Sequence, residues 1–475
     1  MADLLSVGID IGTTTTQLIF SKIKMENTTG YFAVPRISIV DKEILYQSEV
    51  HLTPLLTETL IDSDGVREIV AQEYQKAGIV SSSVDTGAVI ITGESARKEN
   101  ARAVMERLSA FAGEFVVSTA GPDLESVIAG KGSGAWAYSL DHHCEAVNLD
   151  IGGGTTNIVV FSEGDVIAKG CFDIGGRLIR VENGRITHIS PSAKLVAESL
   201  GLSVQVGNAA DTAQLSKITD CMAELLAESL GLLPKSALLD AVTTNNSTPL
   251  TYRTKPKTAV FYSGGVANRI EPLSAEPFPY GDIGALLGAS VFRGTLFGET
   301  TAQQSTQTIR ATVVGAGMFT TTVSGSTITC TSAQFPMKNI PVLKLTPDEQ
   351  EQCFLGNVQA LISRIRWFCE QSETEQLVLA LPGKENPEFP EVKRLAVCLA
   401  DALEQTLPKD APLLVLIETD IAKAVGILMR SVLGSARDVV CIDCVRVEQG
   451  DYMDLGKPLF DGLVIPIVVK SLLFG

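Results

Sequence analysis

Two short segments of the 475-residue chain carry a carboxylate, glycine and hydroxyl groups in the same order. They are GIDIGTTTTQLIF, residues 8–20, and NLDIGGGTTNIVVF, residues 148–161. In each segment an apolar strand runs into an aspartate, Asp10 or Asp150, and a second apolar strand follows the hydroxyl groups. A carboxylate at the end of an apolar strand is costly to bury without a partner. The residue types therefore predict that both aspartates bind something.

Glycine-rich turns let a polyphosphate approach the backbone, because residues without a Cβ leave the N–H groups accessible. Threonine hydroxyls beside such a turn can donate to phosphate oxygens. The candidate phosphate-binding residues are Gly12, Thr13, Thr14, Thr15, Gly152, Gly153, Gly154, Thr155 and Thr156. An acid beside phosphate needs a cation between them, so Asp10 and Asp150 are candidate Mg²⁺ ligands, bound directly or through water.

The two segments read as strand hairpins, and they recur with a period of 140 residues. Solenoid repeats have periods of roughly 20–50 residues, so this spacing favours two similar lobes that face each other. Between the hairpins the apolar spacing predicts a helix over 63–79, a buried strand over 87–93 and a helix over 95–113 that ends at Gly113. This alternation of strands and helices is typical of an α/β fold.

A strand at 258–263 runs into a turn at Gly264 and Gly265 and then into a predicted helix, which places the two glycine amides at a strand-to-helix corner. A helix rich in small residues follows at 280–294. The polar segment 298–308 is the predicted domain boundary. The sequence thus predicts domains at 1–140, 141–298 and 309–475.

The last predicted domain opens with residues 309–325, which resemble the two hairpins but have Gly315 where those have aspartate. Residues 412–429 resemble the strand, turn and helix near Gly264. A degenerate third repeat is one interpretation of this region. Without the acid, it is not expected to hold a metal-bound phosphate.

Charge and composition limit the classes of partner. The formal net charge is −17 and no cluster of Lys and Arg stands out, so a nucleic-acid partner is not expected. No signal peptide is visible at the N-terminus, and no uncharged apolar run reaches the ~20 residues that span a bilayer. We therefore expect a cytoplasmic protein with no membrane partner.

The two hairpins together with the SGG corner, in this order, resemble the superfamily of actin, heat-shock chaperones and sugar kinases over residues 5 to about 295. The resemblance implies two ribonuclease-H-like lobes with ATP in the cleft between them, followed here by an additional C-terminal α/β domain. It also implies Mg²⁺ near Asp10 and Asp150, and adenosine and the α-phosphate against Gly264, Gly265 and Asn268.

Three segments resemble the family of ethanolamine ammonia-lyase reactivating factors in their amino-acid sequence. They are TAGPDLESVIAGKGSGA (residues 119–135), the second hairpin and the C-terminal PLFDGLVIPIVVKSLLF. The match extends over nearly the whole chain. It implies an ATP-dependent, chaperone-like protein that promotes the exchange of damaged cobalamin for adenosylcobalamin on inactivated ethanolamine ammonia-lyase. It also suggests an association with a bacterial microcompartment.

Two further acids lie near the cleft in this interpretation, and either can orient the attacking water. Glu125 can instead belong to the solvated face of a helix, and Asp173 can instead cap a turn before Gly175 and Gly176. Both structural alternatives remain open at this point.

Three other functions compete with a reactivating ATPase. A small-molecule kinase of the same superfamily would need an acidic base that meets the γ-phosphate across a substrate pocket. An actin-like scaffold would need long surface insertions for head-to-tail contacts. An activator with an iron–sulfur cluster would rest on Cys441 and Cys444 alone, and such clusters need more thiolates, placed in a loop.

Overall fold

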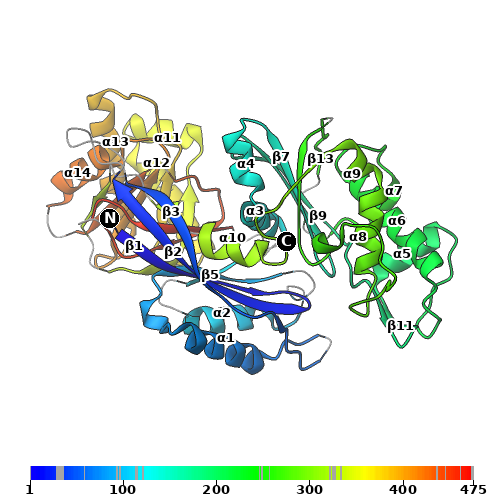
Figure 1. Cartoon of the computed structure of the whole chain (residues 1–475). Helices are drawn as coiled ribbons and strands as arrows, with labels where there is room; N and C mark the ends of the chain where they lie inside the picture. The colour runs from blue at the N-terminus through cyan, green and yellow to red at the C-terminus, as the bar shows by residue number, and fades with distance from the viewer. Residues whose placement is uncertain are drawn as a thin grey trace.

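The computed structural model describes most of the chain. The described residues are 2–27, 37–57, 59–92, 95, 98–112, 116–119, 122–244, 247, 250–255, 257–319, 322–323, 328–331, 334–434, 437–443, 445–459 and 462–471. They form a mixed α/β protein with three main sheets (Figure 1). Within this part of the chain, every helix is too short or too polar to span a lipid bilayer.

The first sheet has the strand order β3-β2-β1-β5-β6, and β4 pairs with β2 at its side. Its strands are β1 (Ala2–Ile11), β2 (Thr15–Asn27), β3 (Ile37–Gln47), β4 (His51–Leu52), β5 (Thr86–Ile91) and β6 (Val116–Thr119). The first three strands are antiparallel, whereas β5 and β6 continue the sheet in parallel with β1. Apolar side chains of α1 (Ser63–Ala77) and α2 (Ala101–Ala112) pack on one face.

The second sheet repeats this arrangement with the order β9-β8-β7-β12-β13. Its strands are β7 (Glu145–Ile151), β8 (Thr156–Ser162), β9 (Asp165–Phe172), β12 (Ala259–Ser263) and β13 (Thr301–Gln303). Here too the first three strands are antiparallel and the last two are parallel to the first. The duplicated hairpin predicted from the sequence is therefore confirmed, and the duplication extends to the strand order of both sheets.

The second sheet is covered by a helical layer. The helices of this region are α5 (Pro191–Ser199), α6 (Thr212–Ser229), α7 (Ala237–Ala241), α8 (Gly284–Arg293) and α9 (Thr295–Glu299). Strands β10 (Ile179–Glu182) and β11 (Arg185–Ile189) form a separate two-stranded sheet. Helix α6 begins at a capping aspartate, Asp211, whose carboxylate accepts from two backbone amides of the first turn. Its apolar face joins the core of this sheet, which is the largest of the protein.

Two helices tie the sheets together by crossing from one to the other. Helix α3 (Pro122–Ser133) follows the first sheet but packs, with α4 (Ala135–Asp141), on the second sheet. Helix α10 (Ala311–Phe319) follows the second sheet but packs on β1, β2 and β5 of the first, near the centre of the molecule (Figure 1). The two helices also pack directly on each other.

Helix α10 corrects the prediction of a third hairpin at 309–325. Residues 311–319 are helical, only Thr322 and Val323 form a short strand, β14, and residues 320–321 and 324–327 lie outside the described residues. The segment has no polar face because it is buried between the first sheet and α3, and a helix that is apolar all round gives no periodic signal.

The third sheet has eight strands in the order β14-β21-β20-β16-β17-β18-β19-β15. Strands β16 to β19 are parallel and consecutive, which differs from the order in the first two sheets. The strands are β15 (Thr329–Cys330), β16 (Met337–Lys344), β17 (Val378–Leu381), β18 (Leu413–Ile417), β19 (Val439–Asp443), β20 (Asp451–Leu455) and β21 (Pro466–Ser471). The helices are α11 (Pro347–Phe354), α12 (Val358–Gln371), α13 (Phe389–Thr406) and α14 (Ala422–Leu433).

Other predicted elements agree in type and differ at their ends. The predicted strand at 87–93 is β5, and the predicted helix at 63–79 is α1, which ends at Gly78 in the left-handed conformation. Helix α2 starts at Ala101 rather than at residue 95, and Gly113 lies outside the described residues. The bounds of the three domains stay predictions.

The contact between α3 and α10 depends on glycine. A Cβ on Gly315 would lie 2.1 Å from the carbonyl oxygen of Ile128 in α3. We expect Gly315→Ala to lower the free energy of unfolding by about 1–3 kcal/mol, because neither backbone can move freely. Gly298→Ala in α9, where no atom lies within 4 Å of the added carbon, should instead raise it by about 0.5–1 kcal/mol. Urea unfolding of both variants checks this, and equal effects would contradict it.

Candidate functional site

The two hairpins turn in the same way. Strands β1 and β2 pair up to Ile11 and Thr16, and strands β7 and β8 pair up to Ile151 and Thr156. Each pair is closed by a four-residue turn, residues 12–15 (the first loop) and 152–155 (the second loop). The Gly12 amide donates to the Thr15 carbonyl at 2.8 Å, and the Gly152 amide donates to the Thr155 carbonyl at 2.9 Å.

The structure brings the two loops together. The hydroxyl oxygen of Thr14 in the first loop lies 3.4 Å from the position that a Cβ on Gly153 of the second loop would occupy. Because Gly153 has no side chain, its backbone faces Thr14 directly. Two loops that are 140 residues apart in sequence thus lie face to face, as the repeat predicts.

Asp10 is buried at the point where parallel strands β1 and β5 end. Asp10 is only 8 % exposed, and its Oδ1 accepts a hydrogen bond from the Thr92 hydroxyl at 2.9 Å. Burial raises the pKa of Asp10 to about 7; the Thr92 hydrogen bond opposes this rise, and the nearby charge of Asp150 adds to it. The two acids are therefore close enough to interact electrostatically.

Asp150 occupies the equivalent place in the second sheet. It is 6 % exposed and pairs in register with Ser263 of the parallel strand β12. The Ser263 hydroxyl donates to Oδ1 at 2.6 Å, and the Thr312 hydroxyl in α10 donates to Oδ2 at 3.3 Å. Burial raises the pKa of Asp150 against the lowering effect of these two hydrogen bonds.

This pair of acids fits a hydrated magnesium ion rather than a metal held by protein alone. Among the described residues no group of three or more His, Cys, Asp or Glu side chains is arranged to hold a metal. Mg²⁺ prefers six oxygens and commonly takes one or two from carboxylates, with the others from water and phosphate. Two buried carboxylates beside two loops that can receive phosphate match that donor set.

The strand-to-helix corner differs from the expectation in two details. The predicted helix is a single 3-10 turn, η3 (Ala267–Arg269), which contains Asn268. Gly264 has a φ of 85° and packs on the second hairpin, since a Cβ there would lie 2.4 Å from the Ile151 carbonyl oxygen. The Gly264 amide donates to the Thr308 carbonyl. Of the two glycines, Gly265 therefore presents the open side, since a Cβ on it would meet no atom within 4 Å.

The two candidate water-orienting acids are half-buried in different elements. Glu125 lies in α3, the helix that packs on α10 and the second sheet. Asp173 follows β9, where its carboxylate accepts from the Thr244 hydroxyl at 2.7 Å and its amide donates to the Val242 carbonyl at 2.7 Å. These two contacts join Asp173 to residues about 70 positions further along the chain. Both the turn-cap alternative and the catalytic role of either acid stay predictions.

The structure adds three hydroxyl residues that the sequence did not single out. Thr92, Ser263 and Thr312 hold the two acids, and they come from β5's end, from β12 and from α10. Ser263 stands within the SGG motif, which was a usable signal. Thr92 and Thr312 are single threonines among apolar residues, and the sequence contained no signal for their role.

Of the two cysteines Cys441 and Cys444, the structure describes Cys441. Cys441 is buried in β19, where burial raises the pKa of its thiol, and Cys444 lies outside the described residues. A thiol that resists ionisation in an apolar strand is a poor cluster ligand.

Fold and site together define the class as an α/β protein with two sheets of one strand order, each bearing an acid and a glycine hairpin at the same edge. The chain belongs to the family of ethanolamine utilisation protein EutA, whose model matches residues 2–475.

Two curated relatives, both named ethanolamine ammonia-lyase reactivase EutA, match along the whole chain. The protein of Salmonella typhimurium is 38 % identical over 476 residues, with 99 % of this chain and 98 % of the relative covered. The protein of Escherichia coli is 39 % identical over 474 residues, with the same two shares covered. A solved structure of the Aquifex aeolicus PPX-GPPA enzyme is 15 % identical, covers 66 % of this chain and 99 % of its own, and has a TM-score of 0.41, too low to support an argument.

The raised pKa of Asp10 predicts a specific pH dependence of stability. The folded protein holds a proton on Asp10 at pH values where the unfolded chain, with a pKa of 3.8, has released it. Protonated Asp10 therefore adds to the free energy of unfolding. This stabilisation is complete below pH 3.8 and is lost as the pH rises toward 7, at up to about 1.4 kcal/mol per pH unit.

Urea unfolding at pH 5, 6, 7 and 8, without nucleotide or metal, should show a loss of roughly 1 kcal/mol per pH unit between pH 5 and 7 in the wild type relative to Asp10→Asn, and a much smaller loss between pH 7 and 8. Asp64→Asn, which changes an exposed carboxylate, should keep the wild-type slope. A variant at Asp10 with the wild-type slope would contradict the assignment.

Proposed function

We propose that this protein is an ATP-dependent reactivating factor for ethanolamine ammonia-lyase, which drives the exchange of damaged cobalamin for adenosylcobalamin on the inactivated enzyme. The observation that carries the proposal is the pair of acid-bearing hairpins whose loops face each other at Thr14 and Gly153. The identity of 38–39 % along the whole chain to proteins named as reactivases supplies the target. It does not favour the small-molecule kinase.

The phosphates of ATP would lie between the first and second loops, with Mg²⁺ on the side of Asp10 and Asp150. The metal would neutralise the charge that builds up between phosphate oxygens and the two carboxylates. Thr92 orients Asp10, and Ser263 with Thr312 orients Asp150, so that carboxylate oxygens point to fixed positions. Asp10, with a pKa of about 7, would release its proton when the metal binds.

Adenosine would lie at the open side of Gly265, close to Asn268, because Gly264 is closed off by Ile151 and Thr308. The attacking water would be oriented by Glu125 or Asp173.

The two sheets would act as the two lobes of an actin-like ATPase. Helices α3 and α10 cross between them, and Thr312 of α10 contacts Asp150, so a change at the phosphates would reach the contact between the lobes. The closed and open states would differ in the surface that the protein offers to the lyase. We place this activity in the cytoplasm, in association with the microcompartment that the family resemblance suggests.

Phosphate release from Mg-ATP tests the proposal. We expect Asp150→Asn to lower the rate by about 100-fold or more, because the metal loses one of its two carboxylates. Asp165→Asn, an exposed acid of β9 in the same sheet, should keep the wild-type rate.

The same proteins are then added to cobalamin-inactivated ethanolamine ammonia-lyase with free adenosylcobalamin. Lyase activity should return only with nucleotide and only with wild type or Asp165→Asn. If ATP is hydrolysed but the lyase stays inactive, the proposed target is wrong. If Asp150→Asn hydrolyses ATP normally, the proposed metal site is wrong.

A further inference from the structure

A short segment after β3 passes behind the first loop and holds it. We define residues 48–53, which include β4, as the strap. The Thr53 amide donates to the Thr14 carbonyl at 2.9 Å, and the Thr53 hydroxyl donates to the Gly12 carbonyl at 2.9 Å. Strand β4 also pairs with Thr15 and Thr16. The strap therefore contacts the first loop at both of its ends.

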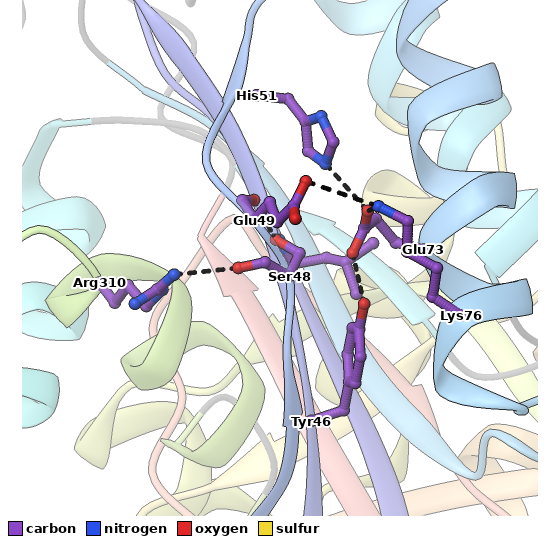
Figure 2. Close-up of polar contacts among 8 residues, drawn as sticks. Tyr46, Ser48, Glu49, His51, Glu73, Lys76 and Arg310 are labelled. Atoms are coloured by element: carbon purple, nitrogen blue, oxygen red, sulfur yellow. Dashed lines mark hydrogen bonds and ion pairs between the residues drawn. The ribbon is translucent and has the colours of Figure 1, made fainter.

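The strap has an outer anchor on α1, which Figure 2 shows. Nε2 of His51 lies 3.0 Å from Oε1 of Glu73, a residue of α1 whose side chain is fully buried. The same carboxylate accepts from the Tyr46 hydroxyl at 2.6 Å and from the Lys76 ammonium at 2.7 Å. A buried acid with three donors around it has little freedom to move.

Glu73 is held in its charged form. Burial alone would raise its pKa, but the hydrogen bonds from Lys76, Tyr46 and His51 outweigh burial and lower the pKa below its usual value. A carboxylate can only accept, so His51 donates from Nε2. The contact that fixes the strap is thus a charge-assisted hydrogen bond, the strong kind.

The strap has an inner anchor at Ser48. The Ser48 amide donates to the Leu18 carbonyl at 2.9 Å, and the Leu18 amide donates to the Ser48 hydroxyl at 2.9 Å. The Arg310 guanidinium donates to the Ser48 carbonyl at 3.0 Å (Figure 2). Arg310 directly precedes α10, in which Thr312 contacts Asp150. The strap is therefore connected to α10, which holds Asp150.

The second loop is held differently. The segment behind it also follows the third strand of its sheet, as the strap does in the first sheet. There the Gly176 amide donates to the Gly152 carbonyl at 2.9 Å, and the Arg177 amide donates to the Gly153 carbonyl at 2.7 Å. A Cβ on Gly175 would lie 2.4 Å from the Gly153 carbonyl oxygen. Close backbone packing fixes the second loop, whereas a side-chain cluster fixes the strap behind the first.

We propose that His51 and Glu73 are positioning residues for the first phosphate loop: by fixing the strap, they keep Gly12 and Thr14 in the geometry that receives phosphate. The inference rests on the proposed function for its nucleotide, but the strap itself is a property of the free protein. Neither side chain touches the nucleotide. Loss of the pair would loosen the loop before binding, so bound ATP would react at its usual rate.

Hydrogen exchange of the nucleotide-free protein tests the mechanical part. In His51→Leu the amides of residues 13–16 and 51–53 should exchange about tenfold faster, as expected when a hydrogen bond to a charged group is lost. Residues 153–156 serve as an internal reference and should not change. Tyr46→Phe is the matched control, because it removes a donor from the same carboxylate without touching the strap.

Unchanged exchange at the first loop in His51→Leu would overturn the inference, and so would an equal rise at both loops, which would indicate general destabilisation. His51→Gln, which can still donate to Glu73, should exchange nearly as slowly as the wild type.

Steady-state hydrolysis of Mg-ATP tests the functional part. We expect His51→Leu to raise KM about tenfold while kcat stays within about twofold, because binding rather than chemistry is affected. A fall in kcat with unchanged KM would overturn the positioning role. If the wild type neither binds nor hydrolyses ATP, the proposed function fails by itself, and hydrogen exchange still decides whether the strap holds the loop.

Discussion

The structure is organised around two carboxylates that are buried close to each other. Asp10 and Asp150 lie at equivalent places, where a parallel strand pair ends, and their charges interact unfavourably across the gap between two glycine loops. Hydroxyl groups alone do not compensate for this: the pKa of each acid stays raised in spite of its hydrogen bonds. The raised pKa of Asp10 reflects this cost, which a proton on Asp10 relieves and which a cation between the two acids would offset.

The first two sheets and the helices between them hold these acids close to each other. Each sheet presents its hairpin with the same register, and the crossing helices α3 and α10 fix one sheet against the other. Glycines allow this crossing, since a Cβ on Gly132 would lie 1.9 Å from the Ala311 carbonyl oxygen and one on Gly315 would meet Ile128. Through Thr312, the helix that packs on the first sheet also holds the acid of the second. A displacement of Asp150 would therefore reach, through Thr312, the contact between the two sheets.

The sequence predicted the hairpins and both acids, because a strand, an aspartate, a glycine turn and hydroxyl groups are local signals. It did not predict the partners of the acids: Thr92 is 82 residues from Asp10, while Ser263 and Thr312 are 113 and 162 residues from Asp150. A lone threonine carries no sign of such a distant contact. Helix α10 was predicted as a hairpin because its burial on all sides removes the periodic pattern that distinguishes a helix. The strap was not foreseen either, since His51 and Glu73 meet only once α1 has packed on the first sheet.

The central claim is that the two acids share one cation with the nucleotide, and proton release on binding tests it most directly. Calorimetric titration of Mg-ADP into the protein at pH 7, in buffers of different ionisation enthalpy, gives the number of protons released. Because the pKa of Asp10 is about 7, we predict release of about half a proton per bound nucleotide by the wild type and clearly less by Asp10→Asn, which should also bind more weakly. Equal binding and equal proton release by the two proteins would contradict a shared cation at Asp10 and Asp150.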